Sequence, residues 1–273
     1  MGTLFVVATP IGNLQDMTPR AIDVLKSVDL IAAEDTRHTG NLLRIFEIAT
    51  PTISYHRHNQ ASRADRLLEA LQTGDVALVS DAGTPAIADP GHELVAAAIA
   101  AGHLIVPIPG ASSLLAAVSA SGIVDGPFLF VGFLPRSGEN RARSITRSLA
   151  TRLPFVVFES PLRTLDTLED LAAIEPDRFG VVARELTKLH EQFLRGRLSE
   201  LVESLRETPP RGEVVIVVGA DEEAGQFASE DAESLARALL AQGMKPSRAA
   251  REVAATTGLD SAAAYELVRR IGM

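Results

Sequence analysis

Short apolar runs alternate along the chain with longer stretches in which apolar residues recur at helical spacing. The short runs are apolar at successive positions, which is typical of strands covered by helices on both faces. The predicted strands are Leu4–Ala8, Leu30–Ala33, Val76–Ser80, Leu104–Ile108, Phe128–Phe133, Phe155–Phe158, Gly180–Ala183 and Val214–Val218. The alternation of strand and helix predicts an α/β fold.

Two helix starts share one pattern, a hydroxyl residue followed by proline. Thr18-Pro19 and Ser160-Pro161 each place a capping side chain before a proline at the first helical position. We therefore predict that helices begin at Pro19 and Pro161.

Composition changes twice along the chain. Residues 109–126 are rich in Gly, Ala, Ser and Pro, which predicts a hinge between two α/β halves. Residues 212–236 hold no Lys or Arg but a cluster of acids, which predicts a linker into a helical tail. We predict an N-terminal α/β domain over 1–115, a C-terminal α/β domain over 116–222 and a helical tail over 230–273.

The tail contains two Ala-rich helical segments that flank a Thr-Gly-Leu turn, with Ser261 as a cap for the second. The pattern is similar to a helix-turn-helix, which presents one helix to nucleic acid. The alternative is that both helices simply pack together.

The overall composition narrows the class of protein. With 46% apolar and 22% charged residues the chain is globular, and the absence of cysteine excludes disulfides, thiolate metal sites and a cysteine nucleophile. A net charge of −9 excludes an overall cationic surface, although not a local basic patch. Gly and Pro interrupt the uncharged residues 94–124, and the N-terminus lacks a basic signal segment. We expect a soluble, cytoplasmic protein.

The candidate chemistry lies in loops that follow predicted strands. Residues 8–14, 33–38, 78–91 and 109–113 each leave a strand through Gly, Pro, hydroxyl or acidic residues. In α/β proteins, ligands bind at the carboxyl ends of strands, so these loops are candidate ligand contacts. The alternatives are tight turns, helix caps and hydrogen bonds within the loops.

Several common sites are absent from the sequence. No G-x-G-x-x-G, no P-loop and no G-x-S-x-G occurs, which argues against an ordinary dinucleotide site, a P-loop kinase and a nucleophile elbow. The histidines lack the spacing of metal ligands, so no metal site is predicted.

A local basic segment is present despite the negative net charge. It contains only one acid, Glu139, among Arg136, Arg141, Arg143, Arg147 and Arg152. Such a segment predicts a phosphate-binding patch for RNA, and the alternative is a solvated helix face.

A series of short sequence motifs follows in a fixed order along residues 3–219. They read TPIGNL, AAEDTR, VSDAGTPAIADPG, PGASS, SGI, GFLPR, FESPLR, ARELTK, and RGE followed by VVIVVG. Together they resemble the tetrapyrrole-methylase superfamily of S-adenosylmethionine-dependent methyltransferases. Within it they resemble the branch that methylates the ribose 2′-oxygen of a cytidine in small-subunit ribosomal RNA.

The resemblance implies two α/β domains that hold S-adenosylmethionine between them, and a homodimer. The cofactor contacts that it implies are Pro10, Asp81, Ala82, Gly83, Ile87, Ser112, Ser113, Phe158, Ala183 and Arg184. Methyl transfer to a ribose hydroxyl requires that its proton be accepted and that negative charge developing on its oxygen be stabilised. The candidate residues for these roles are Asp35, Arg37, Glu185 and Lys188. The alternative is that they form structural ion pairs. The arginines that we expect to contact RNA come from the basic segment, and they are Arg136, Arg141, Arg143 and Arg147.

Two positions depart from the family pattern, and both lie where RNA or a dimer partner would bind. Arg57 stands where an acidic residue is usual, and Leu189-His190-Glu191 replaces an aromatic and acidic pair. The acceptor is either free RNA or the assembled small subunit. The rival functions are methylation of a tetrapyrrole or protein, and noncatalytic RNA binding.

Overall fold

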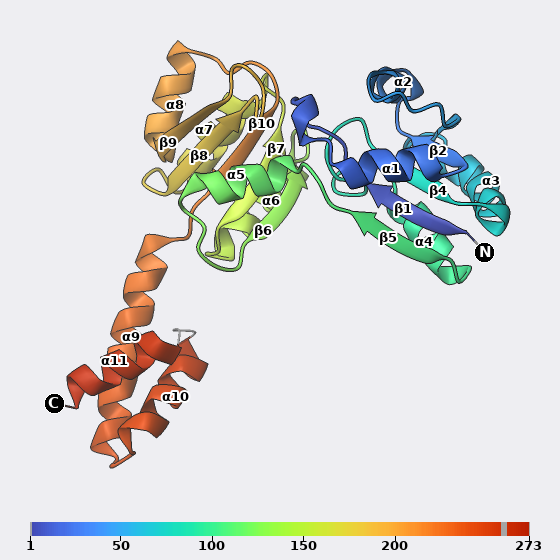
Figure 1. The fold of residues 1–273 in the computed structure, drawn as a ribbon. Coiled ribbons are helices and arrows are strands. Elements are labelled where there is room, and N and C mark those ends of the chain that lie inside the picture. Colours follow the sequence, from blue (N-terminus) through green and yellow to red (C-terminus); the bar gives the residue numbers. More distant parts are fainter. Residues whose placement is uncertain (1, 258–260, 273) are drawn as a thin grey trace.

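The computed structural model describes residues 2–257 and 261–272. Figure 1 shows two α/β lobes side by side, with a helical tail that projects from the second lobe. Each lobe is built on its own five-stranded sheet. Within the described residues, no helix combines the length and apolar character needed to cross a membrane.

The sheet of the first lobe is parallel throughout, in the order β3-β2-β4-β1-β5. Its strands are β1 (Thr3–Val7), β2 (Leu30–Ala33), β3 (Thr52–Ser54), β4 (Val76–Val79) and β5 (Leu104–Ile108). Helices α1 (Pro19–Ser27) and α2 (Thr36–Ile45) pack in one core cluster, and α3 (Gln60–Thr73) and α4 (His92–Ala100) pack in another. Since both faces are covered, the central strand β4 is buried at every position.

The sheet of the second lobe is mixed, in the order β6-β7-β10-β8-β9. Its strands are β6 (Leu129–Phe133), β7 (Phe155–Glu159), β8 (Phe179–Arg184), β9 (Gln192–Arg197) and β10 (Val214–Val218). Only β6 and β7 pair in parallel, and the other neighbours are antiparallel. The core on one face includes residues of α6 (Glu139–Ala150), α7 (Thr164–Ala172) and α8 (Leu198–Glu207). Helix α5 (Ser113–Ser121) packs with β8 and β10 on the other.

The α/β fold class is confirmed, and each predicted strand occurs within two residues of its expected ends. Strands β3 and β9 were not predicted. β3 spans only three residues, and β9 is an edge strand of sequence QFLRGR that lacks a continuous apolar run.

One of the two predicted helix starts is correct. Helix α1 begins at Pro19, and Thr18 is its cap. The start predicted at Pro161 is wrong, because α7 begins at Thr164. The N–H of Arg163 donates to the carbonyl of Ser160 (3.0 Å), which forms a turn before the helix.

The chain passes from the first sheet to the second between Ile108, the end of β5, and α5. The predicted limits of the domains stay predictions. The segment predicted as a linker is mostly regular structure instead, because it contains β10 and the first part of α9 (Glu222–Ala241). The tail packs α9 with α10 (Pro246–Thr257) and α11 (Ser261–Ile271) around its own apolar cluster. The predicted Thr-Gly-Leu turn falls largely on residues 258–260, outside the described residues.

The cap of α1 generates a stability prediction. The hydroxyl of Thr18 accepts the N–H of Ala21 (3.2 Å), so Thr18→Ala leaves a helical donor without this partner. We expect the free energy of unfolding to fall by about 1 kcal/mol. Urea unfolding measures this change, and Thr18→Ser, which keeps the hydroxyl, should lie close to the parent. Equal losses in both variants would contradict the capping role.

Candidate functional site

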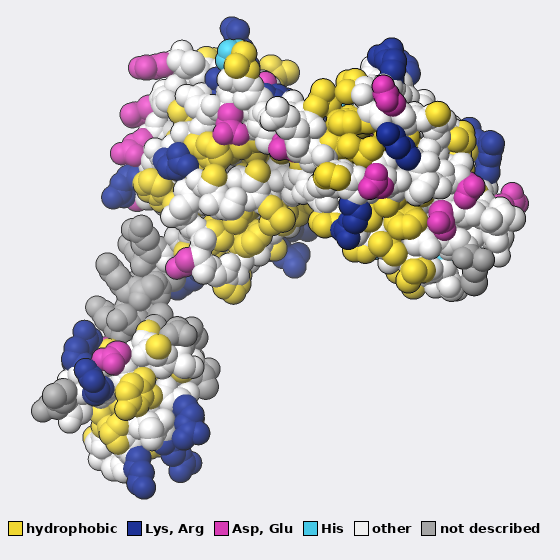
Figure 2. Space-filling view, in the orientation of Figure 1, with side chains coloured by type: hydrophobic (Ala, Val, Ile, Leu, Met, Phe, Trp, Pro, Cys, Tyr) yellow, Lys and Arg dark blue, Asp and Glu magenta, His cyan; other side chains and the backbone are white. Residues whose placement is uncertain are grey.

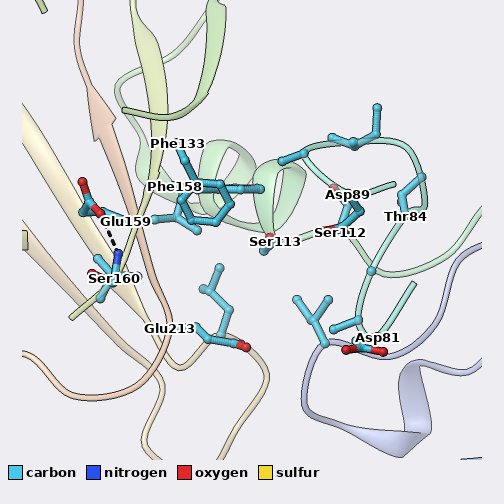
Figure 3. A pocket seen from close by; sticks show the side chains of 18 of the residues that line it. Asp81, Thr84, Asp89, Ser112, Ser113, Phe133, Phe158, Glu159, Ser160 and Glu213 are labelled. Atoms are coloured by element: carbon cyan, nitrogen blue, oxygen red, sulfur yellow. Dashed lines mark hydrogen bonds between the residues drawn. The ribbon is translucent and has the colours of Figure 1, made fainter. Parts of the chain in front are cut away.

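A cavity of about 450 Å³ lies between the two lobes. Because the first sheet is parallel, the loops that follow β1, β2, β4 and β5 all leave it at one edge, and residues of these four loops line the cavity. The second lobe contributes the ends of β6 and β7 and the start of β10. Figure 3 shows Phe133 and Phe158 on one side of the cavity and Asp81, Thr84 and Asp89 on the other.

Backbone pairing joins the loop after β4 to the loop after β1. The N–H of Thr9 donates to the carbonyl of Gly83 (2.9 Å), and the N–H of Gly83 donates back to Thr9 (3.0 Å). Gly83 has a φ of +80°, a left-handed conformation that glycine adopts without steric cost. A side chain at this position would also meet Ile11, so glycine brings the backbone close to the cavity.

Side chains connect the same loop to its other neighbours. Asp81 Oδ1 accepts the N–H of Asp35 (3.0 Å), and this bond joins the ends of β4 and β2. The hydroxyl of Thr84 donates to the carbonyl of Ala111 (3.3 Å), which fixes the loop after β5. Loops from three strands are therefore held in one arrangement before any ligand enters.

The loop after β4 also carries backbone strain. Ala86 and Ala88 have φ values of 65° and 64°, which residues other than glycine seldom adopt. Arg57 donates to the carbonyl of Ala88 (2.6 Å) and so braces this segment from the end of β3. Strained backbone held by its surroundings is characteristic of ligand-binding sites.

The charged side chains that line the cavity are all acidic. Its acidic lining residues are Glu34, Asp81, Asp89, Glu159 and Glu213. Among the described residues that line it, none is Lys, Arg or His. Glu159 and Glu213 are paired with cations from outside the lining, Glu159 with Arg163 (2.9 Å) and Glu213 with Lys188 (3.1 Å). The other three carboxylates all belong to the first lobe, and this acidic side of the cavity disfavours a polyphosphate ligand and favours a cation.

Burial and mutual repulsion change the pKa of two of these carboxylates. Burial, reinforced by the charge of Glu34, raises the pKa of Asp89 to about 6. Burial raises the pKa of Glu34 as well, although the N–H of Asp81 opposes this shift. Carboxyl groups with raised pKa values are frequent at functional sites because they exchange protons near neutral pH.

An ion-pair cluster lies where the two lobes meet. Lys188 Nζ donates to Glu185 (2.9 Å) and to the cavity residue Glu213 (3.1 Å). The hydrogen bond from Lys188 lowers the pKa of Glu185. Gly12 of the first lobe lies directly against the Lys188 side chain, so this cluster contacts the loop after β1.

The structure brings most of the predicted cofactor residues together. Those that line the cavity are Asp81, Ala82, Gly83, Ile87, Ser112, Ser113 and Phe158. Pro10 directly precedes the lining residue Ile11. Ala183 is fully buried and belongs to the same core cluster as Ile11. Arg184 is directed elsewhere, because it donates to Gln192 (2.7 Å) and to the carbonyl of Arg211.

The four candidates for proton or charge chemistry lie outside the lining. Asp35 caps α2 and pairs with Arg37 (2.8 Å), and the hydrogen bond from Arg37 holds the pKa of Asp35 well below its usual range. Glu185 and Lys188 pair with each other at the lobe contact. These are the ion pairs that the sequence left as the alternative, Asp35 with Arg37 and Glu185 with Lys188.

The four predicted RNA-contacting arginines occupy different environments. Arg136 and Arg147 are exposed, and the part of the chain that the structure describes offers neither of them an ion pair. Arg143 is paired with Glu139 on the surface of α6. Arg141 is buried, because it binds Asp170 (2.7 Å) and the hydroxyl of Thr167 (2.9 Å), so its guanidinium is not available to a phosphate.

Sequence reasoning did not single out the other residues of the lining, although some of them lie in the candidate loops 8–14, 33–38 and 78–91. They are Ile11, Glu34, Thr84, Ala88, Asp89, Phe133, Glu159, Ser160, Pro161, Leu186, Glu213, Val214 and Val215. Most of them belong to recognised motifs, so their closeness in sequence to a predicted residue could have indicated them. Glu213 and Leu186 also belong to recognised motifs, RGE and ARELTK, but only the pairing of β10 with β7 and β8 brings them to the cavity.

The raised pKa of Asp89 generates a prediction on pH. The folded state binds this proton more tightly than the unfolded chain does, so the contribution to stability is present below about pH 4 and is lost as pH rises to about 6. Asp89→Asn removes this dependence. Relative to the parent, its free energy of unfolding should increase by about 1 kcal/mol between pH 4 and pH 7, after allowance for solvent screening.

Urea unfolding at successive pH values measures this difference. Asp65→Asn, an exposed carboxylate of α3, is the matched control and should follow the parent curve. Parallel curves for Asp89→Asn and the parent would contradict the assignment.

Comparison with known proteins identifies the family. A family model described as Tetrapyrrole (Corrin/Porphyrin) Methylases matches residues 3–202. A protein from Synechocystis named ribosomal RNA small subunit methyltransferase I is 49% identical over 98% of this chain and 97% of its own. Its namesake from Bacillus subtilis is 48% identical over 80% of this chain and 75% of its own.

Solved structures share the fold at low identity. Diphthine synthase matches with a TM-score of 0.63 and 17% identity, over 81% of this chain and 90% of its own. Uroporphyrin-III C-methyltransferase from Thermus thermophilus, complexed with S-adenosyl homocysteine, matches with a TM-score of 0.56 and 19% identity, over 80% and 97%. The chain therefore belongs to the tetrapyrrole methylase family and, within it, to the group of ribosomal RNA small subunit methyltransferase I.

Proposed function

We propose that this protein transfers a methyl group from S-adenosylmethionine to the ribose 2′-oxygen of a cytidine in small-subunit ribosomal RNA. The observation that carries the proposal is the cavity between the lobes, which is lined by carboxylates and by no basic described residue. The names of relatives that match nearly the whole chain support the choice of acceptor.

The residues of the cavity fit a sulfonium donor. The carboxylates favour its positive charge, and Ile11, Ile87 and Leu186 offer apolar surface to its carbon skeleton. Asp81 and the backbone of Ala82 and Gly83 would hold the donor from the first lobe, with Ser112 and Ser113 beside them. Phe158 would close the site from the second lobe, and Pro10 and Ala183 would shape it from behind.

When bound, S-adenosylmethionine supplies an electrophilic methyl group. The protein then has to align the attacking 2′-oxygen and receive its proton. Asp35 and Glu185 are poor proton acceptors, because their ion pairs lower their pKa values. Glu34 and Asp89 line the cavity and have raised pKa values, so they are better suited to this task.

The acceptor would approach along surfaces that carry exposed arginines. Arg136 and Arg147 are exposed on the second lobe, and Figure 2 shows further Lys and Arg side chains over the tail. An RNA phosphate backbone would be attracted to these arginines and repelled by the acidic cavity. We propose that the tail contacts RNA. We also propose that the protein acts as a homodimer in the cytoplasm. Its acceptor would be either free small-subunit RNA or the assembled small subunit.

Methyl transfer to defined RNA tests the function. The purified protein is incubated with S-adenosylmethionine and either naked small-subunit RNA or the assembled subunit, and mass spectrometry locates the methyl group. We expect one 2′-O-methylcytidine. Asp81→Asn should weaken donor binding by calorimetry about tenfold or more, because it removes a charge that faces the cavity.

The exposed variant Asp65→Asn is again the matched control and should bind the donor like the parent. Donor binding without RNA methylation would point to a different acceptor, such as a tetrapyrrole or a protein. If the parent protein fails to bind S-adenosylmethionine, the proposal is overturned altogether.

A further inference from the structure

An exposed aromatic side chain stands at the mouth of the cavity. Phe133, the last residue of β6, lines the cavity and yet has 56% of its surface exposed. One edge packs against Phe158, with ring centroids 5.7 Å apart at 66°, and Phe158 in turn packs on Phe130. Figure 3 shows Phe133 beside Phe158, on the side of the cavity opposite Asp81.

The backbone that carries Phe133 is held rigidly. Arg163 donates both to the carbonyl of Leu134 (2.9 Å) and to the Glu159 carboxylate (2.9 Å), so it joins the ends of β6 and β7. Glu159 is buried and also accepts the hydroxyl of Thr167 (2.9 Å). Because this network is internal, the position of Phe133 is set before a ligand arrives.

A large aromatic ring that stays exposed contributes little to the stability of the fold. Burying such a ring stabilises a fold by roughly 1.5–3 kcal/mol, and more than half of that gain is forgone at Phe133. The adjoining loop after β7 also presents Leu162, which is 91% exposed. Phe133 thus offers an exposed apolar ring at the cavity, and Leu162 adds an exposed apolar side chain one residue beyond the lining residue Pro161.

The charges around this surface indicate what the ligand is. The cavity is acidic within, so phosphates must remain outside it. Arg136, three residues beyond Phe133, is exposed and has no ion pair among the described residues. An exposed apolar ring and an exposed guanidinium three residues apart match a nucleotide of single-stranded RNA, in which the base stacks and the phosphate pairs.

We propose that Phe133 is the stacking surface for the base of the acceptor nucleotide, and that Arg136 contacts an adjoining phosphate. This inference rests on the proposed function, since it assumes that the acceptor is RNA. Splaying one nucleotide out of the strand onto Phe133 would bring its ribose to the mouth of the cavity, where the 2′-oxygen faces the donor.

Steady-state methylation of small-subunit RNA and calorimetry with S-adenosylmethionine test it together. Phe133→Ala should raise the KM for RNA roughly tenfold to a hundredfold and leave donor affinity unchanged. Phe133→Trp, which keeps a stacking face, should stay near the parent. Ile174→Ala is the matched control, because Ile174 is 52% exposed on the same lobe but does not line the cavity.

The outcomes separate the two proposals. An unchanged KM for RNA in Phe133→Ala would overturn the stacking role while RNA methylation by the parent stands. An equal loss of donor affinity would mean that Phe133 stacks on the donor's adenine instead, which also overturns it. Failure of the parent to methylate RNA would overturn the proposed function and this inference with it. Rescue by Phe133→Trp separates stacking from a loss of folding in the alanine variant.

Discussion

Thr9 and Gly83 exchange two backbone hydrogen bonds at the carboxyl ends of β1 and β4, and this pairing draws two loops into one surface. The side chains of Asp81 and Thr84 extend the surface to the loops after β2 and β5. All four loops leave a parallel sheet at the same edge, so their polar groups are displayed together without a helix between them. The left-handed conformation of Gly83 lets the pairing form without a side chain in the way.

The electrostatics of the cavity follow from this crowding of strand ends. Carboxylates gathered in a partly buried space repel one another, and burial adds to the cost of their charge. The protein tolerates this through raised pKa values at Glu34 and Asp89 and through backbone N–H groups such as that of Asp81. A site organised in this way before binding has little reorganisation to undergo when a cation enters.

The second lobe contributes a different kind of surface. Its mixed sheet ends at the cavity in aromatic and apolar side chains, and buried ion pairs hold the loops after β6 and β7 in place. The first lobe therefore supplies polar backbone and carboxylates, and the second supplies a rigid apolar wall. The tail has its own core and extends from the second lobe, so it can carry basic residues without disturbing the cavity (Figure 1).

Much of this could be predicted from the sequence, because the relevant signals are local. The buried strands are continuous apolar runs, the loops after them carry Gly, Pro and acidic residues in order, and the missing glycine-rich motifs exclude the common nucleotide sites. The family resemblance, rather than these local signals, implied the cofactor residues Asp81, Gly83 and Ser112, and they line one cavity. Edge strands such as β9 have no continuous apolar run, and the acidic composition of α9 concealed a helix.

Only the tertiary structure decided which charged groups are free to act. Asp35 and Arg141 have the same chemistry in the sequence as any reactive carboxylate or phosphate-binding arginine. In the structure, Asp35 is ion-paired with Arg37, and Arg141 is buried and bound to Asp170. Glu213 and Phe133 come to the cavity because strands distant in sequence pair beside one another. The periodicity of a chain reports how each segment is covered, whereas the contacts between segments depend on a strand order that no local pattern encodes.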